Sequence, residues 1–363
     1  MNALEHQLDY VFADTRPAGG TVHEVAPGVL WVCMPLPFKL DNINLWLLRD
    51  QLGAQPGWTI IDCGISNDTI KANWERIFDG VLGGLPVLRV LVTHFHPDHL
   101  GLAHWLCGGG ERDRWSAPLW MTLGEYLMGR LLSLARDGDS NAGGEAAARF
   151  FARHGMTDPQ SIENIRVRKG YYHTLVPEVP ASYVRLREGD AVTIGTRTWR
   201  VMTGFGHSTE HCALYCEADR LLVSGDMVLP WISTNVSVFE MEPCGNPLAQ
   251  YLDSLGRYQG LPDDTWVLPS HGKPFRGLHT RIAQLREHHA ARLDEVREAC
   301  ARALQSAADI VPLMFKRPLD LHQMTFAMGE ALAHLHFLWH AGELDRFECD
   351  GVIRFAPPAG GAH

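Results

Sequence analysis

The sequence predicts an α/β protein, and three observations support this. Short apolar runs rich in β-branched residues recur along the first three quarters of the chain and are typical of buried strands. Segments with apolar residues at spacings of three and four lie between and after these runs, which indicates amphipathic helices. The 363 residues are 46% hydrophobic, enough for one large domain with a small one or for two medium domains.

The expected elements follow from this patterning, after an N-terminal extension over residues 1–20. Several turns and strand ends are marked by Pro27-Gly28, Gly64, Pro97 and Asp219, residue types that interrupt regular structure. Strands are expected at 22–34 with a turn at 27–28, 42–49, 58–64, 85–92, 117–122, 184–202 as a meander, 212–217, 220–223 and 266–272. Helices are expected at 66–78, 98–106, 123–134, 145–154 and 159–168.

The overall composition argues against several partners and compartments. No apolar run reaches about 18 residues, so no membrane-spanning helix is expected. The first ten residues lack a basic region followed by an apolar stretch, so we expect no signal peptide. The formal charge of −10 disfavours nucleic acid or an anionic membrane as the main partner. The eight cysteines are scattered without a Cys-x-x-Cys pair, which fits a cytoplasmic protein.

A dense polar motif follows the strand expected at residues 85–92. Residues 93–99 read Thr-His-Phe-His-Pro-Asp-His. His94 and His96 are two positions apart, so in extended chain their side chains point to the same side. Pro97 cannot donate to a strand ladder and therefore ends the strand. The two histidines form one candidate pair of metal ligands.

The second half of this motif supplies another pair. Asp98 and His99 lie at the start of the helix expected over residues 98–106. Two ligand pairs a few residues apart suit two metal ions about 3.5–4 Å apart better than one. Imidazole and carboxylate ligands without thiolate favour Zn²⁺, with iron or manganese as alternatives. The sequence therefore predicts a site for two divalent metal ions.

Three later strand ends carry side chains of the same types. His207 follows a glycine-rich strand end, where glycine lets the backbone approach a metal closely. Asp226 ends the run Ser-Gly-Asp, and a carboxylate there can bridge two metals through its two oxygens. His271 ends the strand that begins at Trp266. Asp62 also ends a buried strand, and aspartate is a common turn residue as well.

The motif at residues 94–99 resembles the HxHxDH signature of metallo-β-lactamase-fold hydrolases, which include hydroxyacylglutathione hydrolase (glyoxalase II) and acyl-homoserine lactonases. The order of the later motifs extends the resemblance over residues 20–280. It implies an αββα sandwich and a pair of metal ions. The implied ligands are His94, His96 and His207 for the first metal, Asp98, His99 and His271 for the second, and Asp226 for both.

The resemblance also implies residues behind the ligands. It places Asp62 and His211 there, and a carboxylate at such a position can orient a ligand histidine and make it more basic. The segment from His207 to His211 is similar to the family's Gly-His-Thr/Ser-Pro-Gly-His motif. It departs from that motif at Thr209 and Glu210, which stand in place of Pro-Gly.

The resemblance implies hydrolysis by a hydroxide shared between the two metals. Asp98 and Asp226 are the catalytic candidates, Asp98 because it could orient the hydroxide and Asp226 because it bridges the metals. Members that degrade β-lactams place a cysteine where this chain has Asp226, so that activity is disfavoured. The expected partner is a small-molecule acyl substrate with a thioester, lactone or ester bond. The basic side chains with which glyoxalase II holds glutathione are not identifiable here.

A long segment, about residues 121–187, is expected to form a helical lid over the site. Tyr171 and Tyr172 could supply a phenol near the substrate, although packing of the lid on the core is the favoured interpretation for each. Asn235 follows Asp226 in a polar loop and could contact substrate or cap backbone groups. These three residues are the candidates for substrate binding.

A domain boundary is expected near residue 280, which divides the chain into a catalytic domain at 1–280 and a C-terminal domain at 281–363. A connecting helix begins at Arg281, helices follow at 309–315 and 320–339, and a hairpin is expected at 342–346 and 351–355. This order resembles a winged-helix-like domain found in one subgroup of the same fold. His336 and His340 lie four apart on the last helix, and core packing is the favoured interpretation.

Three other functions stay open at this point. The winged-helix-like region resembles that of an endoribonuclease subgroup, which would make the chain a phosphodiesterase. Its nine Lys and Arg residues against eleven Asp and Glu residues over 281–363 oppose binding of nucleic acid. The second alternative is a persulfide dioxygenase, which shares the fold and uses a single iron ion. The third is a metal-bound sensor, which would bind metal without catalysing a reaction. The oligomeric state is open as well, a homodimer included.

Overall fold

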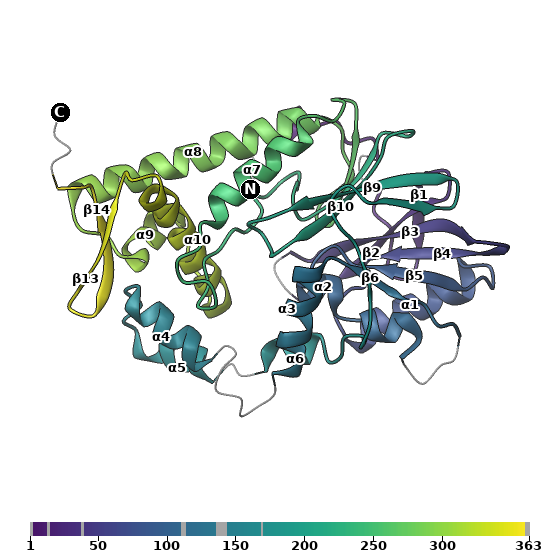
Figure 1. Ribbon diagram of the computed structural model, residues 1–363, viewed down its shortest axis with the longest axis horizontal. Helices are drawn as coiled ribbons and strands as arrows, with labels where there is room; N and C mark the ends of the chain where they lie inside the picture. Colours follow the sequence, from purple (N-terminus) through teal and green to yellow (C-terminus); the bar gives the residue numbers. More distant parts are fainter. Residues whose placement is uncertain are drawn as a thin grey trace.

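The computed structural model describes residues 3–12, 15–37, 40–109, 114–135, 144–167 and 170–359. Two β-sheets pack face to face, and helices cover their outer faces (Figure 1). This is the α/β sandwich that the sequence predicts. Within the described ranges, no helix combines the length and the apolar character needed to cross a membrane.

The first sheet contains seven strands in sequence order. The strands pair antiparallel from β1 to β4 and parallel from β4 to β7. The parallel part brings the carboxyl ends of β4, β5 and β6 to one edge, where Asp62 and the histidine motif follow. The strands are β1 (Val22–Ala26), β2 (Val29–Pro35), β3 (Asn42–Leu52), β4 (Gln55–Ile61), β5 (Val87–Leu91), β6 (Leu119–Met121) and β7 (Val184–Arg185).

The second sheet has the strand order β12-β11-β10-β9-β8. All neighbours are antiparallel except β11 and β12, which run parallel. Between the sheets lies an apolar core that includes the fully buried Trp31, Trp46 and Trp199. The strands are β8 (Ala191–Ile194), β9 (Arg197–Gly204), β10 (His211–Cys216), β11 (Leu221–Gly225) and β12 (Trp266–Pro269).

Helix α1 (Asp68–Gly80) covers the outer face of the first sheet. It buries Ile70, Trp74 and Ile77, the three residues whose spacing predicts it. Asn67 begins the helix by accepting a hydrogen bond from the backbone N–H of Ile70 (2.8 Å).

Two helices cover the outer face of the second sheet. Helix α8 (Leu278–Arg302) begins three residues before the expected Arg281, and α7 (Pro247–Tyr258) was not predicted. Both contribute to the core that lies against this sheet. A 3-10 turn, η1 (Glu5–Gln7), lies in the N-terminal extension, and Asp9 pairs with Arg276 near the start of α8.

The predicted lid contains four helices that lie in two places. They are α3 (Leu123–Leu134), α4 (Glu145–Arg153), α5 (Pro159–Arg166) and α6 (Tyr171–Leu175). Helices α3 and α6 contact each other close to α2 and the first sheet, whereas α4 and α5 lie against the C-terminal region (Figure 1). The backbone N–H of Ala308 donates to the carbonyl of His154 just after α4 (3.2 Å). Residues 136–143 and 168–169 of this segment lie outside the described residues.

The C-terminal region consists of helices and a two-stranded sheet. Its elements are α9 (Ala307–Met314), α10 (Leu321–His340), β13 (Asp345–Cys349) and β14 (Val352–Ala356). Strand β13 begins three residues later than expected, because Gly342 and Glu343 donate their N–H groups back to the end of α10. Residues 360–363 of the predicted tail lie outside the described part.

Two further expectations were wrong in detail. The helix expected over 98–106 is the short α2 (Pro97–Leu100), because the N–H of Leu102 donates to the carbonyl of Gly64 rather than to the preceding turn (3.0 Å). A π-helical turn, η2 (Trp105–Gly109), follows it. The meander expected over 184–202 is divided between the sheets, since β7 pairs with β6 while β8 and β9 belong to the second sheet.

Candidate metal centre

Seven predicted side chains meet where the two sheets end together. His94, His96, Asp98 and His99 come from the segment after β5. His207 follows β9, Asp226 follows β11 and His271 follows β12. The first sheet therefore supplies one half of the site, and the second sheet supplies the other half.

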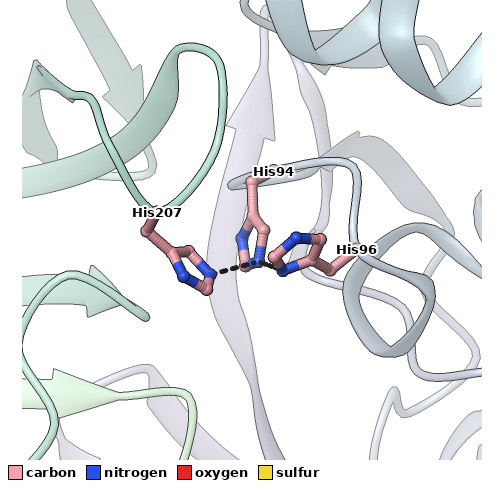
Figure 2. A group of neighbouring side chains, drawn as sticks. All are labelled: His94, His96 and His207. Carbon is pink, nitrogen blue, oxygen red and sulfur yellow. Dashed lines mark hydrogen bonds between the residues drawn. The ribbon is translucent and has the colours of Figure 1, made fainter. Parts of the chain in front are cut away.

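Three histidines form the first cluster (Figure 2). The Nε2 atom of His94 lies 2.9 Å from Nδ1 of His96 and 3.2 Å from Nε2 of His207. Thr93 donates its hydroxyl hydrogen to Asp62 (2.9 Å), so it can only accept a hydrogen from Nδ1 of His94 (3.0 Å). The neutral ring of His94 then presents a lone pair at Nε2.

His207 presents a lone pair to the same point. Its Nδ1 donates to the carbonyl of Asn235 (2.8 Å), which leaves Nε2 of the neutral ring without a hydrogen. Two nitrogen lone pairs facing each other at 3.2 Å repel, and a cation bound to both would remove the repulsion. The cluster therefore fits a metal ion better than a hydrogen-bonded network.

Asp98, His99 and His271 form the second cluster. Oδ2 of Asp98 lies 3.3 Å from Nε2 of His271 and 3.8 Å from Nε2 of His99. His271 donates from Nδ1 to the carbonyl of Asn42 (2.9 Å), so its Nε2 faces the centre. The Nε2 atoms of both histidines are buried and have no hydrogen-bond partner in the described part of the chain. Buried polar atoms rarely stay without a partner, and a bound metal ion would be the partner of both nitrogens.

Asp226 lies between the two clusters. Its Oδ2 is 3.5 Å from Nε2 of His207 and 3.6 Å from Nε2 of His271. Its Oδ1 is 3.6 Å from Nε2 of His99 and has no hydrogen-bond partner among the described residues. One carboxylate thus faces ligand atoms of both clusters, as a bridging role requires.

Burial lowers the pKa of the histidines at the centre, whereas neighbouring carboxylates raise it. Burial, followed by the neighbouring imidazoles, holds the pKa of His94 and of His96 well below the usual range. Burial also lowers the pKa of His207. Burial opposes the charged form of His99, but Asp62, Asp98 and Asp226 together outweigh it and raise its pKa to about 10. The first cluster is therefore neutral and ready to bind a metal at pH 7.

The second cluster carries compensating charge. The carboxylates of Asp226 and Asp98 raise the pKa of His271 against the effect of burial. His99 and His271 in turn lower the pKa of Asp98, again against burial. A divalent metal would replace the proton on an imidazole here, so metal binding is coupled to proton release.

Asp62 and His211 lie behind the ligands. Asp62 accepts hydrogen bonds from the N–H of Thr93 (2.8 Å) and from Nδ1 of His99 (2.8 Å), which fixes the direction in which His99 points. Asp62 adopts a left-handed conformation (φ 62°) to do so. Nε2 of His211 accepts from the N–H of Asp226 (3.2 Å). A Cβ atom on Gly225 would lie 2.2 Å from that nitrogen, so only glycine fits there.

The three candidates for substrate binding differ in what they contact. The hydroxyl of Tyr172 donates to the carbonyl of Phe95, between two ligand histidines, so it holds the motif in place. Tyr171 is 38% exposed, and its ring lies 6.2 Å from that of His322 in α10. The carbonyl of Asn235 orients His207, while its side chain accepts from Ser237 (2.8 Å).

Sequence reasoning missed Glu125, a fully buried carboxylate in α3. It accepts hydrogen bonds from the segments that carry His94, His96 and His207. No local motif marks it, because its partners lie 30 or more positions away along the chain. Glutamate is rarely fully buried, so its burial indicates a special role. The sequence alone does not show that Glu125 is buried.

Comparisons with known proteins agree with this architecture. The family model of the metallo-beta-lactamase superfamily matches residues 39–298, and a model described as the metallo-beta-lactamase-like C-terminal domain matches residues 293–358. The probable metallo-hydrolase YqjP of Bacillus subtilis (strain 168) is 24% identical over 323 residues, which cover 85% of this chain and 92% of that protein.

Two solved structures are similar over nearly the whole chain. A beta-lactamase domain protein from Burkholderia ambifaria is 65% identical, with a TM-score of 0.93 over 98% of this chain and 100% of that one. A metallo-beta-lactamase family protein from Thermus thermophilus is 26% identical, with a TM-score of 0.74 over 92% of this chain and 100% of that one. Since the family model also covers more than half of the residues, the chain belongs to the metallo-beta-lactamase superfamily of metal-dependent hydrolases.

Proposed function

We propose that the protein hydrolyses an ester-type acyl bond, a thioester, lactone or ester, at a centre of two divalent metal ions, most simply Zn²⁺. The observation that carries the proposal is the position of Asp226, whose two oxygens face His99 on one side and His207 on the other (3.6 and 3.5 Å). When bound, the two ions would lower the pKa of water from about 15.7 toward 7 and polarise the carbonyl of the scissile bond.

The residues of the chain have separate tasks in this reaction. His94, His96 and His207 would hold one ion, and their low pKa values keep them neutral for it. Asp98, together with His99 and His271, would hold the other ion and orient the attacking water through its carboxylate. The family resemblance, with aspartate rather than cysteine at position 226, supports hydrolysis of an ester-type bond rather than of a β-lactam amide.

Metal analysis combined with a substrate panel tests the proposal. Purified protein would be assayed for bound metals by mass spectrometry and for turnover of thioesters, lactones, simple esters, phosphodiesters and single-stranded RNA. We expect two metal ions per chain and turnover of acyl substrates that a chelator abolishes and Zn²⁺ restores. Cleavage of RNA or phosphodiesters alone, or a single bound iron, would replace the proposed function by one of the alternatives.

A further inference from the structure

Glu125 connects the two halves of the metal centre from outside the ligand set. Its side chain is fully buried at the start of α3. Oε2 accepts the N–H of Phe95 (2.9 Å), the residue between His94 and His96. Oε1 accepts the N–H of Glu210 (2.5 Å), in the segment that follows His207. One carboxylate thus holds backbone from both sheets.

Two hydroxyl groups strengthen the contact with the second half. Ser208 donates to Oε1 of Glu125 (2.7 Å), and Thr209 donates to the same oxygen (3.0 Å). Burial raises the pKa of Glu125, and these hydrogen bonds oppose the rise. The backbone N–H groups of Phe95 and Glu210 can only donate and lie at opposite oxygens of Glu125, so a carboxylate satisfies both, whereas an amide turns its own N–H groups toward one of them. Charge-assisted hydrogen bonds of this kind are roughly twice as strong as neutral ones.

Glu210 returns the contact to α3. Its Oε2 accepts the N–H of Gly124 (2.9 Å), and its carbonyl accepts the hydroxyl of Thr122 (2.6 Å). The start of α3 and the segment after His207 therefore hold each other by hydrogen bonds in both directions. We call these hydrogen bonds between residues 122–125 and residues 208–210 the lock. The lock includes Thr209 and Glu210, the two positions at which the chain departs from the family's Pro-Gly.

We propose that Glu125 is a positioning residue that sets the distance between the His94–His96 segment and His207, and so determines the affinity of the three-histidine cluster for its metal ion. The inference rests on the proposed metal centre. The second cluster depends less on Glu125, because its ligands are held by Asp62 and by the carbonyl of Asn42. Loss of the lock should therefore weaken one metal site selectively.

Glu125→Gln tests this with metal binding as the readout. The variant keeps the shape of the side chain but points an amide N–H at backbone donors. Metal-free protein would be titrated with Co²⁺, whose absorption bands report ligand geometry, and with Zn²⁺ against a chelator of known affinity. We expect about tenfold or greater loss of affinity at one site, as changes behind metal ligands typically cause, and near-normal affinity at the other.

Asp50→Asn is the matched control. Asp50 is also buried, but it accepts hydrogen bonds from Thr59, Arg89 and the N–H of Gly195, none of which belongs to the segments at 93–99 and 207–210 that Glu125 joins. The control should lower stability without changing either metal affinity. Should Glu125→Gln not fold, the double variant Ser208→Ala with Thr209→Val removes two donors from the same oxygen and should cause a smaller loss at the same site.

Three results would overturn the inference. They are unchanged affinity at both sites in Glu125→Gln, equal weakening of both sites, or the same selective loss in Asp50→Asn. Wild-type protein that binds neither Co²⁺ nor Zn²⁺ would overturn the proposed metal centre instead, so the two failures are distinguishable.

Discussion

Two regions of this molecule gather histidines, and only one of them resembles a metal site. The centre combines five imidazoles with Asp98 and Asp226, whereas the C-terminal histidine cluster consists of His289, His334, His336 and His340 on α8 and α10. Among the described residues, every group of His, Cys, Asp or Glu side chains close enough to hold a metal lies at the centre.

Hydrogen bonds from ring nitrogens of the C-terminal cluster attach its helices to neighbouring segments, although Nε2 of His289 and of His336 has no hydrogen-bond partner among the described residues. His336 donates to the carbonyl of Gly245 (2.9 Å) and His340 to that of Cys244 (2.9 Å), which attaches α10 to the loop before α7. His336 is buried, as predicted, whereas His340 is exposed. Burial lowers the pKa of His336 and of His334 to about 4.

The difference lies in charge and direction rather than in the number of histidines. At the centre, carboxylates raise the pKa of His99 to about 10, and the Nε2 atoms of His94 and His207 present lone pairs to the same point. At the C-terminal cluster, burial keeps the rings of His334 and His336 neutral. Nδ1 of His334 donates to the carbonyl of Glu330, so its Nε2 can accept a hydrogen bond from Nδ1 of His289 (3.2 Å), and no two lone pairs face each other in this contact. A metal site requires lone pairs that converge on one point, and histidine density alone does not supply them.

The largest effect is expected from Asp226→Ala. Among the described residues, Asp226 is the carboxylate that faces both clusters, so the variant should lose bound metal and reduce kcat/KM by roughly 10³-fold, about 4 kcal/mol of transition-state stabilisation. Metal content by mass spectrometry and steady-state kinetics measure this. Full metal content at the wild-type rate would show that Asp226 does not bridge.

A smaller effect is expected from Asp62→Asn. An amide can still accept from Thr93, but it no longer provides the charge that holds His99 in its orientation. Metal affinity should fall by about 10- to 100-fold. Competition with a chelator measures it, with the exposed Asp68→Asn as the control. Equal affinities in both variants would remove the orienting role.

The variant His336→Ala tests whether the C-terminal histidine cluster acts in packing rather than in metal binding. It removes a buried ring and its hydrogen bond to Gly245, which should cost about 1–3 kcal/mol of unfolding free energy while metal content and turnover stay unchanged. Urea unfolding followed by tryptophan fluorescence gives the stability, and the exposed His340→Ala should have little effect. Loss of metal in His336→Ala would contradict the assignment to packing.

The last prediction concerns pH. His336 has a pKa of about 4 in the folded protein and about 6.5 when unfolded, so the unfolded chain binds more protons between these values. The contribution of this residue to stability is complete above pH 6.5 and is lost as the pH falls toward 4, by at most about 1.4 kcal/mol per pH unit. Unfolding free energies of wild type and His336→Ala should converge over this range, and parallel curves would exclude the pKa shift.

Local patterns predicted much of the molecule. Helix α1 followed from the spacing of Ile70, Trp74 and Ile77, and the hairpin of β1 and β2 from the turn at residues 27–28. The element missed outright was α7, in a stretch for which no element was predicted. Strand β7 was assigned to the wrong partner, because strand pairing is decided by the rest of the sheet rather than by the strand itself.

By itself, the sequence determined which donor groups the candidate centre offers, because His94, His96, Asp98 and His99 lie within six residues and are read as one motif. The tertiary structure alone decided that Glu125 holds both halves of the centre and that α4 and α5 pack on the C-terminal region. Residue type and short spacing act within a few residues of the chain. Contacts between segments far apart depend on how two sheets and their helices close on each other, and no local pattern carries that information.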